Sequence, residues 1–285
     1  MPKLRRTVLY IPADNARALA KAAELPADAV IVDLEDAVAP DRKAAARDAA
    51  RQAVETLTPL KEVALRVNGA DTEWHAQDVA LAAGLAVPVV LPKVKTADDV
   101  ARLAAAAGTV WPMLETAEGV WNALAIARAA VASGGGAAAT ALIVGTNDLA
   151  LELGADPGVD RANLAFALQA IVLAGRAAGA DVIDGVMNDF RDEAGLVAEA
   201  KAGRALGMTG KTVIHPAQIG PVNAAFAPSE GEVAHARAVV AAMEEADAAG
   251  RSVATLNGRM VERLHADAAR RVLALAEAVA GSDAP

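Results

Sequence analysis

Strand-type and helix-type runs alternate eight times between residues 7 and 216. Each short apolar run is followed by an alanine-rich segment of helical length, which is the pattern of parallel strands joined by crossover helices. We expect strands at residues 7–12, 29–36, 63–69, 87–93, 109–116, 141–149, 181–186 and 211–216. Helices at 41–57, 96–107 and 161–178 are expected to begin at the capping residues Asp41, Thr96 and Asp160. Eight such units predict a closed TIM (β/α)8 barrel.

An open, doubly wound sheet is the competing fold. Such sheets carry a G-x-G-x-x-G turn after the first strand, whereas this chain reads Pro12-Ala13-Asp14-Asn15 there. We therefore assign residues 1–227 to a barrel that forms the catalytic domain. Residues 228–285 hold two further helical runs, at 230–248 and about 262–280, which the barrel does not need. We expect this C-terminal helical extension to act as a lid or to pack on a neighbouring subunit.

Charge and composition exclude several classes of function. A net charge of −9 and 2% aromatic residues argue against a nucleic-acid partner or an anionic membrane surface, both of which need a basic face. Although 54% of the residues are hydrophobic, no apolar run approaches the ~18 residues of a membrane span. The basic N-terminus leads into a strand rather than a secretory signal, so we expect a cytoplasmic protein. The absence of cysteine excludes thiol catalysis and thiolate metal sites.

Two of the expected strands, the fifth and the sixth, end at carboxylates, Glu115 and Asp148. The carboxyl ends of parallel strands carry the active sites of such barrels. Two carboxylates there could hold one Mg²⁺ ion, which takes oxygen ligands and keeps waters or substrate oxygens in its other positions. Each acid alone is equally explained as a cap of the helix that follows it.

Nearly every expected strand has a polar or charged end. Acids outnumber bases in this ring, an excess that favours a bound divalent cation. The residues are Asp33, Glu35 and Asp36 at the end of the second expected strand, Arg66 and Asn68 at the end of the third, Lys93 of the fourth, Asp184 of the seventh and His215 of the eighth.

Seven segments together resemble the citrate lyase beta-subunit-like family of the HpcH/HpaI aldolase group, which includes malyl-CoA and citramalyl-CoA lyases and related thioesterases. They follow the family order across nearly the whole chain and read RTVLYIP (6–12), DLEDAV (33–38), RVN (66–68), LPK (91–93), ETA (115–117), DL (148–149) and KTVIHPAQI (211–219). The resemblance implies a TIM barrel assembled as a homotrimer or hexamer. It also implies that Mg²⁺, or Mn²⁺ in its place, serves to make or break a carbon–carbon bond beside a coenzyme A thioester.

The resemblance also implies roles for individual residues. Glu115 and Asp148 would be the metal ligands, and Arg66 would stabilise the thioester enolate unless it merely pairs with nearby acids. Glu35 and Asp36 would reach the metal through water or orient Arg66. Substrate-binding positions are completed by the backbone N–H groups of Gly145, Thr146 and Asn147, which could hold the carboxylate of a 2-oxo acid.

Coenzyme phosphates could be held by Arg17 and Lys21, which are spaced i,i+4 on the first helix, and by the region of His215. A solvated helix face and a histidine packed in the barrel are the alternative explanations. Ala13, where the family commonly has glycine, departs from the expected coenzyme contact.

In the extension, the segment Gly258-Arg259-Met260-Val261-Glu262 resembles a family G-x-M-[IV]-D segment that supplies a catalytic aspartate, often to the neighbouring subunit. Glutamate is one methylene longer, and a shift of ~1 Å in a catalytic group can cost on the order of a hundredfold in rate. Glu262 either acts as this acid, marks a changed reaction, or lies in an exposed first helical turn, where glutamate is favourable.

From these residues we expect an Mg²⁺-dependent lyase or aldolase. It would cleave a beta-hydroxyacyl-CoA such as malyl-CoA, citramalyl-CoA or citryl-CoA into an acyl-CoA and a 2-oxo acid. A malyl-CoA thioesterase is the nearest alternative. The others are a citrate lyase beta subunit that acts only with an acyl carrier protein partner, and a metal-binding protein without catalysis.

Overall fold

Residues 3–156 and 161–282 are described by the computed structural model, and they contain the closed eight-stranded parallel barrel that the alternating runs predict. Each strand pairs with the next in the chain, and β1 closes the barrel against β8, with Thr7 opposite Lys211. The strands are β1 (Thr7–Pro12), β2 (Ala29–Asp33), β3 (Glu62–Arg66), β4 (Val89–Leu91), β5 (Val110–Leu114), β6 (Ala141–Val144), β7 (Asp181–Asp184) and β8 (Gly210–Val213).

The strands are buried on both faces, which explains why their sequences are continuous apolar runs rather than alternating ones. Inside the barrel, Trp111 and Met113 of β5 pack with small side chains such as Ala29, Ala64 and Ala141 from other strands. The outward-facing residues join a second and larger core beneath the helices. Large and small side chains thus fill the barrel interior together, so it is a packed core rather than a pore.

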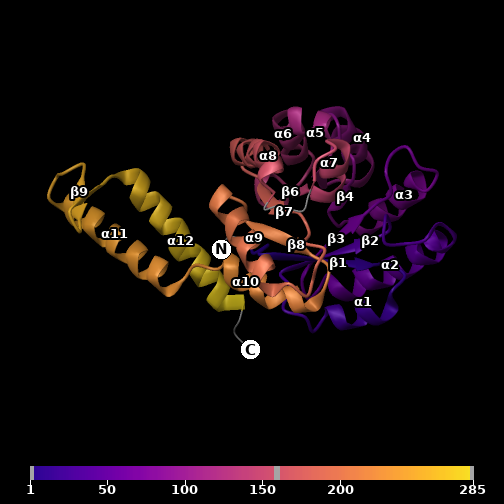
Figure 1. The fold of residues 1–285 in the computed structure, drawn as a ribbon, viewed down its shortest axis with the longest axis horizontal. Coiled ribbons are helices and arrows are strands. Elements are labelled where there is room, and N and C mark those ends of the chain that lie inside the picture. Colours follow the sequence, from indigo (N-terminus) through magenta and orange to yellow (C-terminus); the bar gives the residue numbers. More distant parts are fainter. Residues whose placement is uncertain (1–2, 157–160, 283–285) are drawn as a thin grey trace. The chain divides into compact units, whose positions relative to one another are not determined.

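Helices lie outside the strands (Figure 1). Those that follow the strands are α1 (Ala16–Ala22), α2 (Lys43–Leu57), α3 (His75–Leu85), α4 (Ala97–Ala107), α5 (Ala117–Trp121), α6 (Ala123–Ala132), α7 (Thr146–Glu152), α8 (Ala165–Ala178), α9 (Glu193–Leu206) and α10 (Ile219–Phe226). Short 3-10 turns occur at Pro40–Arg42, Ala137–Ala139, Ala162–Leu164 and Pro216–Gln218.

Several strands end earlier than the apolar runs predict. The largest difference is at β6, which ends at Val144, so that Asn147 and Asp148 belong to the first turn of α7. Thr96 caps α4 in a reciprocal capping box with Asp99, as expected. Asp41 is not a cap, because it is the second residue of a 3-10 turn. Pro40 is the first residue of this turn, and its fixed φ suits the start of a helix. Asp160 lies outside the described residues.

A second compact unit comprises residues 227–282 with Lys3 and Leu4, whereas residues 5–226 form the first. Its helices α11 (Glu230–Ala248) and α12 (Arg263–Ser282) pack on each other through Ala236, Met243 and Ala266. Between them lies a hairpin of β9 (Ala254–Leu256) and β10 (Arg259–Val261), which the sequence analysis missed. The signal was the Asn257-Gly258 pair: both residues have positive φ, 50° and 76°, as a two-residue hairpin turn requires.

No helix in the described ranges is both long enough and apolar enough to span a membrane.

Candidate active site

Glu115 and Asp148 line one cavity of about 300 Å³ at the carboxyl ends of the barrel strands. Glu115 directly follows β5 and is buried, while Asp148 is half-buried in the first turn of α7. Gly145, Thr146 and Asn147 line the same cavity. Register between β5 and β6 therefore brings the two predicted ligands together.

Gly145 lies so close to Glu115 that a larger residue would displace the acid. A Cβ atom at position 145 would stand 2.3 Å from Glu115 Oε2. On its other side, Glu115 Oε1 accepts a hydrogen bond of 2.7 Å from the backbone N–H of Lys93. Lys93 has a φ of 55°, a left-handed conformation that is uncommon outside glycine. Backbone on both sides thus fixes the carboxylate of Glu115.

Burial and the negative charges of Asp148 and Glu35 raise the pKa of Glu115 well above its ordinary value, against the Lys93 N–H bond that lowers it. Two carboxylates in one buried site both ionise readily only when a cation compensates them. Within the described part of the chain, no group of three or more acidic or histidine side chains is arranged for a metal. A pair of carboxylates still fits Mg²⁺, which usually takes only one or two protein carboxylates.

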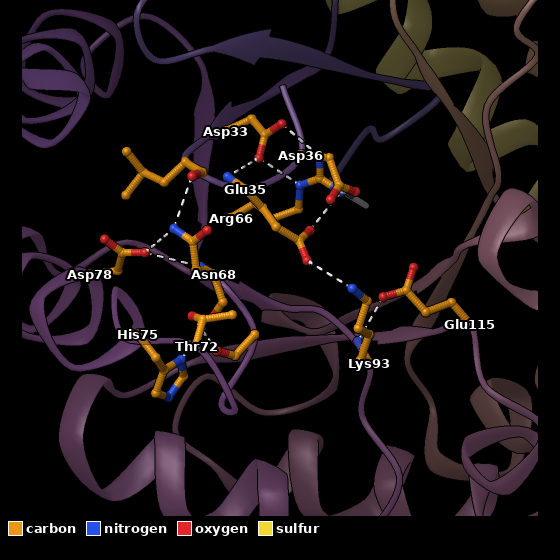
Figure 2. A network of polar contacts seen from close by, with 12 residues as sticks. Asp33, Glu35, Asp36, Arg66, Asn68, Thr72, His75, Asp78, Lys93 and Glu115 are labelled. Carbon is orange, nitrogen blue, oxygen red and sulfur yellow. Dashed lines mark hydrogen bonds and ion pairs between the residues drawn. The ribbon is translucent and has the colours of Figure 1, made fainter. Parts of the chain in front are cut away.

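Arg66 is held by three acids from the end of β2 (Figure 2). Asp33 accepts two parallel hydrogen bonds, from Arg66 Nε to Oδ1 at 2.7 Å and from Nη2 to Oδ2 at 2.6 Å. Glu35 lies 3.0 Å and Asp36 3.6 Å from Nη1. The pairing that we considered as an alternative is therefore present, and Arg66 also lines the cavity. Such pairing orients the guanidinium toward the site.

The carboxyl group of Glu35 changes its charge near neutral pH. Burial raises its pKa to about 7, although the positive charge of Arg66 opposes this shift. Lys93 Nζ lies 3.9 Å from Glu35 Oε1, while the backbone N–H of the same residue donates to Glu115, so Lys93 contacts both acids (Figure 2). A carboxyl group with a pKa near neutrality can act as a general base.

The loop at 33–36 is supported from behind by buried polar groups. Lys43 donates to the carbonyls of Leu34 and Glu35, both at 2.8 Å. Asn68 donates to Leu34 O at 2.9 Å and to Asp78 Oδ2 at 2.6 Å (Figure 2). These bonds satisfy carbonyls that no strand pairing reaches, and they restrict the position of Glu35.

Arg17, Lys21 and His215 line a second cavity, of about 400 Å³. His215 also accepts a hydrogen bond at Nδ1 from Ala217 N and stacks on Phe190, with ring centroids 4.4 Å apart. Three residues, Tyr10, Pro12 and Ile214, line both cavities, so the two adjoin.

Two neighbours of the expected residues were not foreseen. Asn188, in the loop after β7, lines the cavity of Glu115 and Asp148 and exchanges hydrogen bonds of 3.2 and 3.0 Å with the amide of Asn147. Tyr10 lies with its ring against Arg66, whose Cζ is 4.8 Å from the ring centroid. Tyr10 is the only tyrosine in the chain and lies in the segment RTVLYIP that carries part of the family resemblance. These were the available signals for Tyr10, and for Asn188 there was none.

Asp184 differs from the other acids at the strand ends. It is fully buried and pairs with Arg161 Nη1 at 2.7 Å and Lys211 Nζ at 3.3 Å. Both cations compensate its charge, so its role is to tie β7 to β8 and to the segment before α8.

Glu262 belongs to the second unit and directly precedes α12. Its carbonyl accepts hydrogen bonds from His265 N and Ala266 N, at 2.9 and 3.2 Å. The side chain is half-buried. This position at the start of the helix agrees with the electrostatic explanation for a glutamate there and leaves its carboxylate open to other roles.

Paired carboxylates and an oriented arginine at the carboxyl ends of barrel strands are groups that metal-assisted aldol chemistry can use. The model of the HpcH/HpaI aldolase/citrate lyase family matches residues 6–216, and the chain belongs to this family.

Relatives match nearly the full length. The chain is 47% identical to a (3S)-malyl-CoA thioesterase of Cereibacter sphaeroides, over 96% of this chain and 95% of that protein. It is 35% identical to citrate lyase subunit beta of Escherichia coli, over 96% and 94%. A solved structure of CitE from Mycobacterium tuberculosis with magnesium, acetoacetate and coenzyme A superposes with a TM-score of 0.81, at 33% identity, over 96% of this chain and 98% of that one.

Proposed function

We propose that this protein is an Mg²⁺-dependent carbon–carbon lyase that cleaves a beta-hydroxyacyl-CoA of the malyl-CoA type into an acyl-CoA and a 2-oxo acid. The observation that carries this proposal is the meeting of Glu115, Asp148 and Arg66 in one cavity. The adjoining cavity with Arg17, Lys21 and His215 has the charge to bind coenzyme phosphates. The magnesium and coenzyme A in the CitE structure support both assignments.

Glu115 and Asp148 would hold the ion, and Mn²⁺ could replace it. Bound there, it supplies Lewis-acid polarisation of the 2-oxo acid oxygen. Gly145, Thr146 and Asn147 would bind the carboxylate of that acid.

In cleavage, the hydroxyl proton leaves to Glu35, whose pKa is suited to accept it. The bond between the hydroxyl-bearing carbon and the acyl α-carbon then breaks, and its electron pair moves into the thioester enolate. Arg66 stabilises the charge on the enolate oxygen, while Asp33 and Asp36 keep the guanidinium in place. Glu262, from the extension of a neighbouring subunit in a homotrimer or hexamer, returns a proton to the α-carbon.

A malyl-CoA thioesterase is the second candidate, favoured by relatives of that name at 45–47% identity. In this reaction water adds to the thioester carbonyl, the carbon–sulfur bond breaks, and the products are the free acid and coenzyme A. The citrate lyase relatives support a third arrangement, in which an acyl carrier protein presents the substrate.

One panel separates the three. Purified protein with Mg²⁺ is given malyl-, citramalyl- and citryl-CoA, and free thiol and 2-oxo acid are measured. Lyase activity yields 2-oxo acid without thiol, a thioesterase yields thiol without 2-oxo acid, and dependence on a carrier yields neither until acylated carrier is added. Turnover that survives EDTA, or that persists in Glu115→Gln, would contradict the metal-dependent mechanism.

A further inference from the structure

Tyr10 lies where the two cavities of the barrel meet. Its ring packs on the inner barrel core and under the guanidinium of Arg66. Of the three residues that line both cavities, only Tyr10 carries a side-chain hydrogen-bond donor; the others are Pro12 and Ile214.

The hydroxyl of Tyr10 has no hydrogen-bond partner among residues 3–156 and 161–282. Buried side-chain oxygens and nitrogens in these ranges are all partnered, so this oxygen is not sealed in the core but reaches open space in the cavities. A tyrosine hydroxyl surrounded by protein usually finds a partner. The Tyr10 hydroxyl has no protein partner in these ranges and faces both cavities, which suggests that a bound ligand supplies its hydrogen-bond partner.

Burial raises the pKa of Tyr10, and the acids Asp33, Glu115 and Glu35 act in the same direction, against the charge of Arg66. The hydroxyl therefore keeps its proton at neutral pH and is available as a donor.

We propose that Tyr10 is a catalytic residue whose hydroxyl donates a hydrogen bond to the thioester oxygen of the acyl-CoA, alongside Arg66. This inference rests on the proposed function. A substrate with its coenzyme in the Arg17 and Lys21 cavity and its hydroxy-acid end at Glu115 and Asp148 must cross the junction of the cavities. The group that joins these two parts of an acyl-CoA is the thioester.

The proton stays on Tyr10 throughout, and no bond to the protein forms or breaks. The hydrogen bond strengthens as negative charge develops on the thioester oxygen, which is how a donor lowers a barrier rather than merely binding substrate. Because charge develops on this oxygen in carbon–carbon cleavage and in thioester hydrolysis alike, the role does not depend on which reaction the protein performs.

Tyr10→Phe tests the hydroxyl alone, because it keeps an aromatic ring under Arg66. We expect kcat to fall by on the order of a hundredfold, as for loss of one oxyanion donor, with Mg²⁺ affinity and KM changed little. Tyr10→Leu also removes the ring and should lose further activity. A Tyr10→Phe enzyme with the kcat of the wild type would overturn the inference.

A second measurement does not need turnover. Because the chain has one tyrosine, protein grown with tyrosine labelled by ¹³C at Cζ gives a single resonance that reports on this hydroxyl. With Mg²⁺ present, acetyl-CoA should shift it, whereas coenzyme A without an acyl group should shift it much less.

The outcomes separate the role of Tyr10 from the proposed function. If acetyl-CoA binds by calorimetry and leaves the tyrosine resonance unmoved, the role of Tyr10 is wrong and the proposed function stands. If neither acetyl-CoA nor coenzyme A binds, and the thioester panel is not turned over, the proposed function itself is wrong.

Discussion

Asp33 accepts two parallel hydrogen bonds of 2.7 and 2.6 Å from Arg66, at the ends of the adjacent strands β2 and β3. The pair sets the plane of the guanidinium that faces the cavity. Asp33→Asn keeps the shape but removes the charge and one acceptor, so we expect kcat to fall by about 10- to 100-fold through misplacement of Arg66. Arg66→Lys loses the fork altogether and should cost on the order of 10²- to 10³-fold. Steady-state kinetics on the preferred thioester measures both.

The matched control is Asp28→Asn. Asp28 binds Arg6 with the same two-bond geometry, at 2.9 and 2.8 Å, but it precedes β2, whereas Asp33 is the last residue of that strand. This variant should lose stability and keep its kcat. An equal loss of kcat in both variants would show that the Asp33 effect is only structural.

Gly145→Ala should weaken the metal site. The added methyl would stand 2.3 Å from Glu115 Oε2, so the carboxylate must move, and disturbed supporting contacts typically cost 10- to 100-fold in metal affinity. Mn²⁺ titration followed by electron paramagnetic resonance measures this directly. Gly84→Ala, in α3 with no atom within 4 Å of its new methyl, should leave affinity unchanged and add roughly 0.5–1 kcal/mol of stability. Unchanged affinity in Gly145→Ala would contradict the placement of the metal at Glu115.

Without metal, the stability of the protein should fall as the pH rises past the ordinary range of carboxyl groups. Burial and the charge of Asp148 raise the folded-state pKa of Glu115 above its ordinary value of 4.5. The folded protein thus binds this proton more tightly than the unfolded chain does, and the tighter binding stabilises the fold. The stabilisation is complete below about pH 4.5 and is lost as the pH rises through the raised pKa.

Glu115→Gln should remove this penalty. In EDTA at neutral pH we expect it to melt above the wild type, by about 2–4 °C for each kcal/mol relieved. Added Mg²⁺ should raise the melting temperature of the wild type only. Glu118→Gln changes an exposed acid three residues away and should behave like the wild type. A Glu115→Gln protein that melts lower than the wild type in EDTA would refute the proposed repulsion.

Asp184→Asn should destabilise the barrel by about 3–5 kcal/mol, because it leaves the buried ammonium of Lys211 partly uncompensated. Burial opposes ionisation of Asp184, yet Lys211 and Arg161 lower its pKa. Its contribution is therefore present above the ordinary value of 3.8 and is lost as the pH falls through the lowered value. Urea denaturation measures the loss. Asp14→Asn, which breaks the more exposed pair with Arg42, should cost about 1 kcal/mol or less.

Glu262 can be assigned to a subunit by complementation. We expect Arg66→Lys and Glu262→Gln each to be poorly active alone. Co-assembled oligomers should regain activity, because a site that combines intact Arg66 from one chain with intact Glu262 from another then exists. If Glu262 serves its own barrel, every site in the mixture keeps one defect and no activity returns. Exchange of the acetyl-CoA methyl protons with deuterium provides a direct measurement of the proton transfer.

The barrel and the positions of its acids were predictable because they follow from local patterns. Apolar runs of strand length, alanine-rich helices and the polar residue that ends each strand are all visible along the chain, and a closed barrel places all strand ends at one rim. The exact ends of strands were less predictable: Asp148 looks like the end of a strand but lies in the first turn of α7, because β6 already ends at Val144. The Asn257-Gly258 hairpin had a local signal that periodicity alone does not reveal.

Sequence alone therefore determined the fold and which acids stand at its active rim. The pairing of Glu115 with Asp148 was expected from the sequence, and the structure places both in one cavity. Only the tertiary structure decided that Asp33 makes the two-bond contact with Arg66, and that Asp184 pairs with Lys211 and does not line that cavity. It also placed Tyr10 beneath Arg66, between the two cavities. The physical reason is that these contacts join strands and loops distant in sequence, so they depend on strand register and on how side chains pack across the barrel, neither of which is encoded in any local pattern.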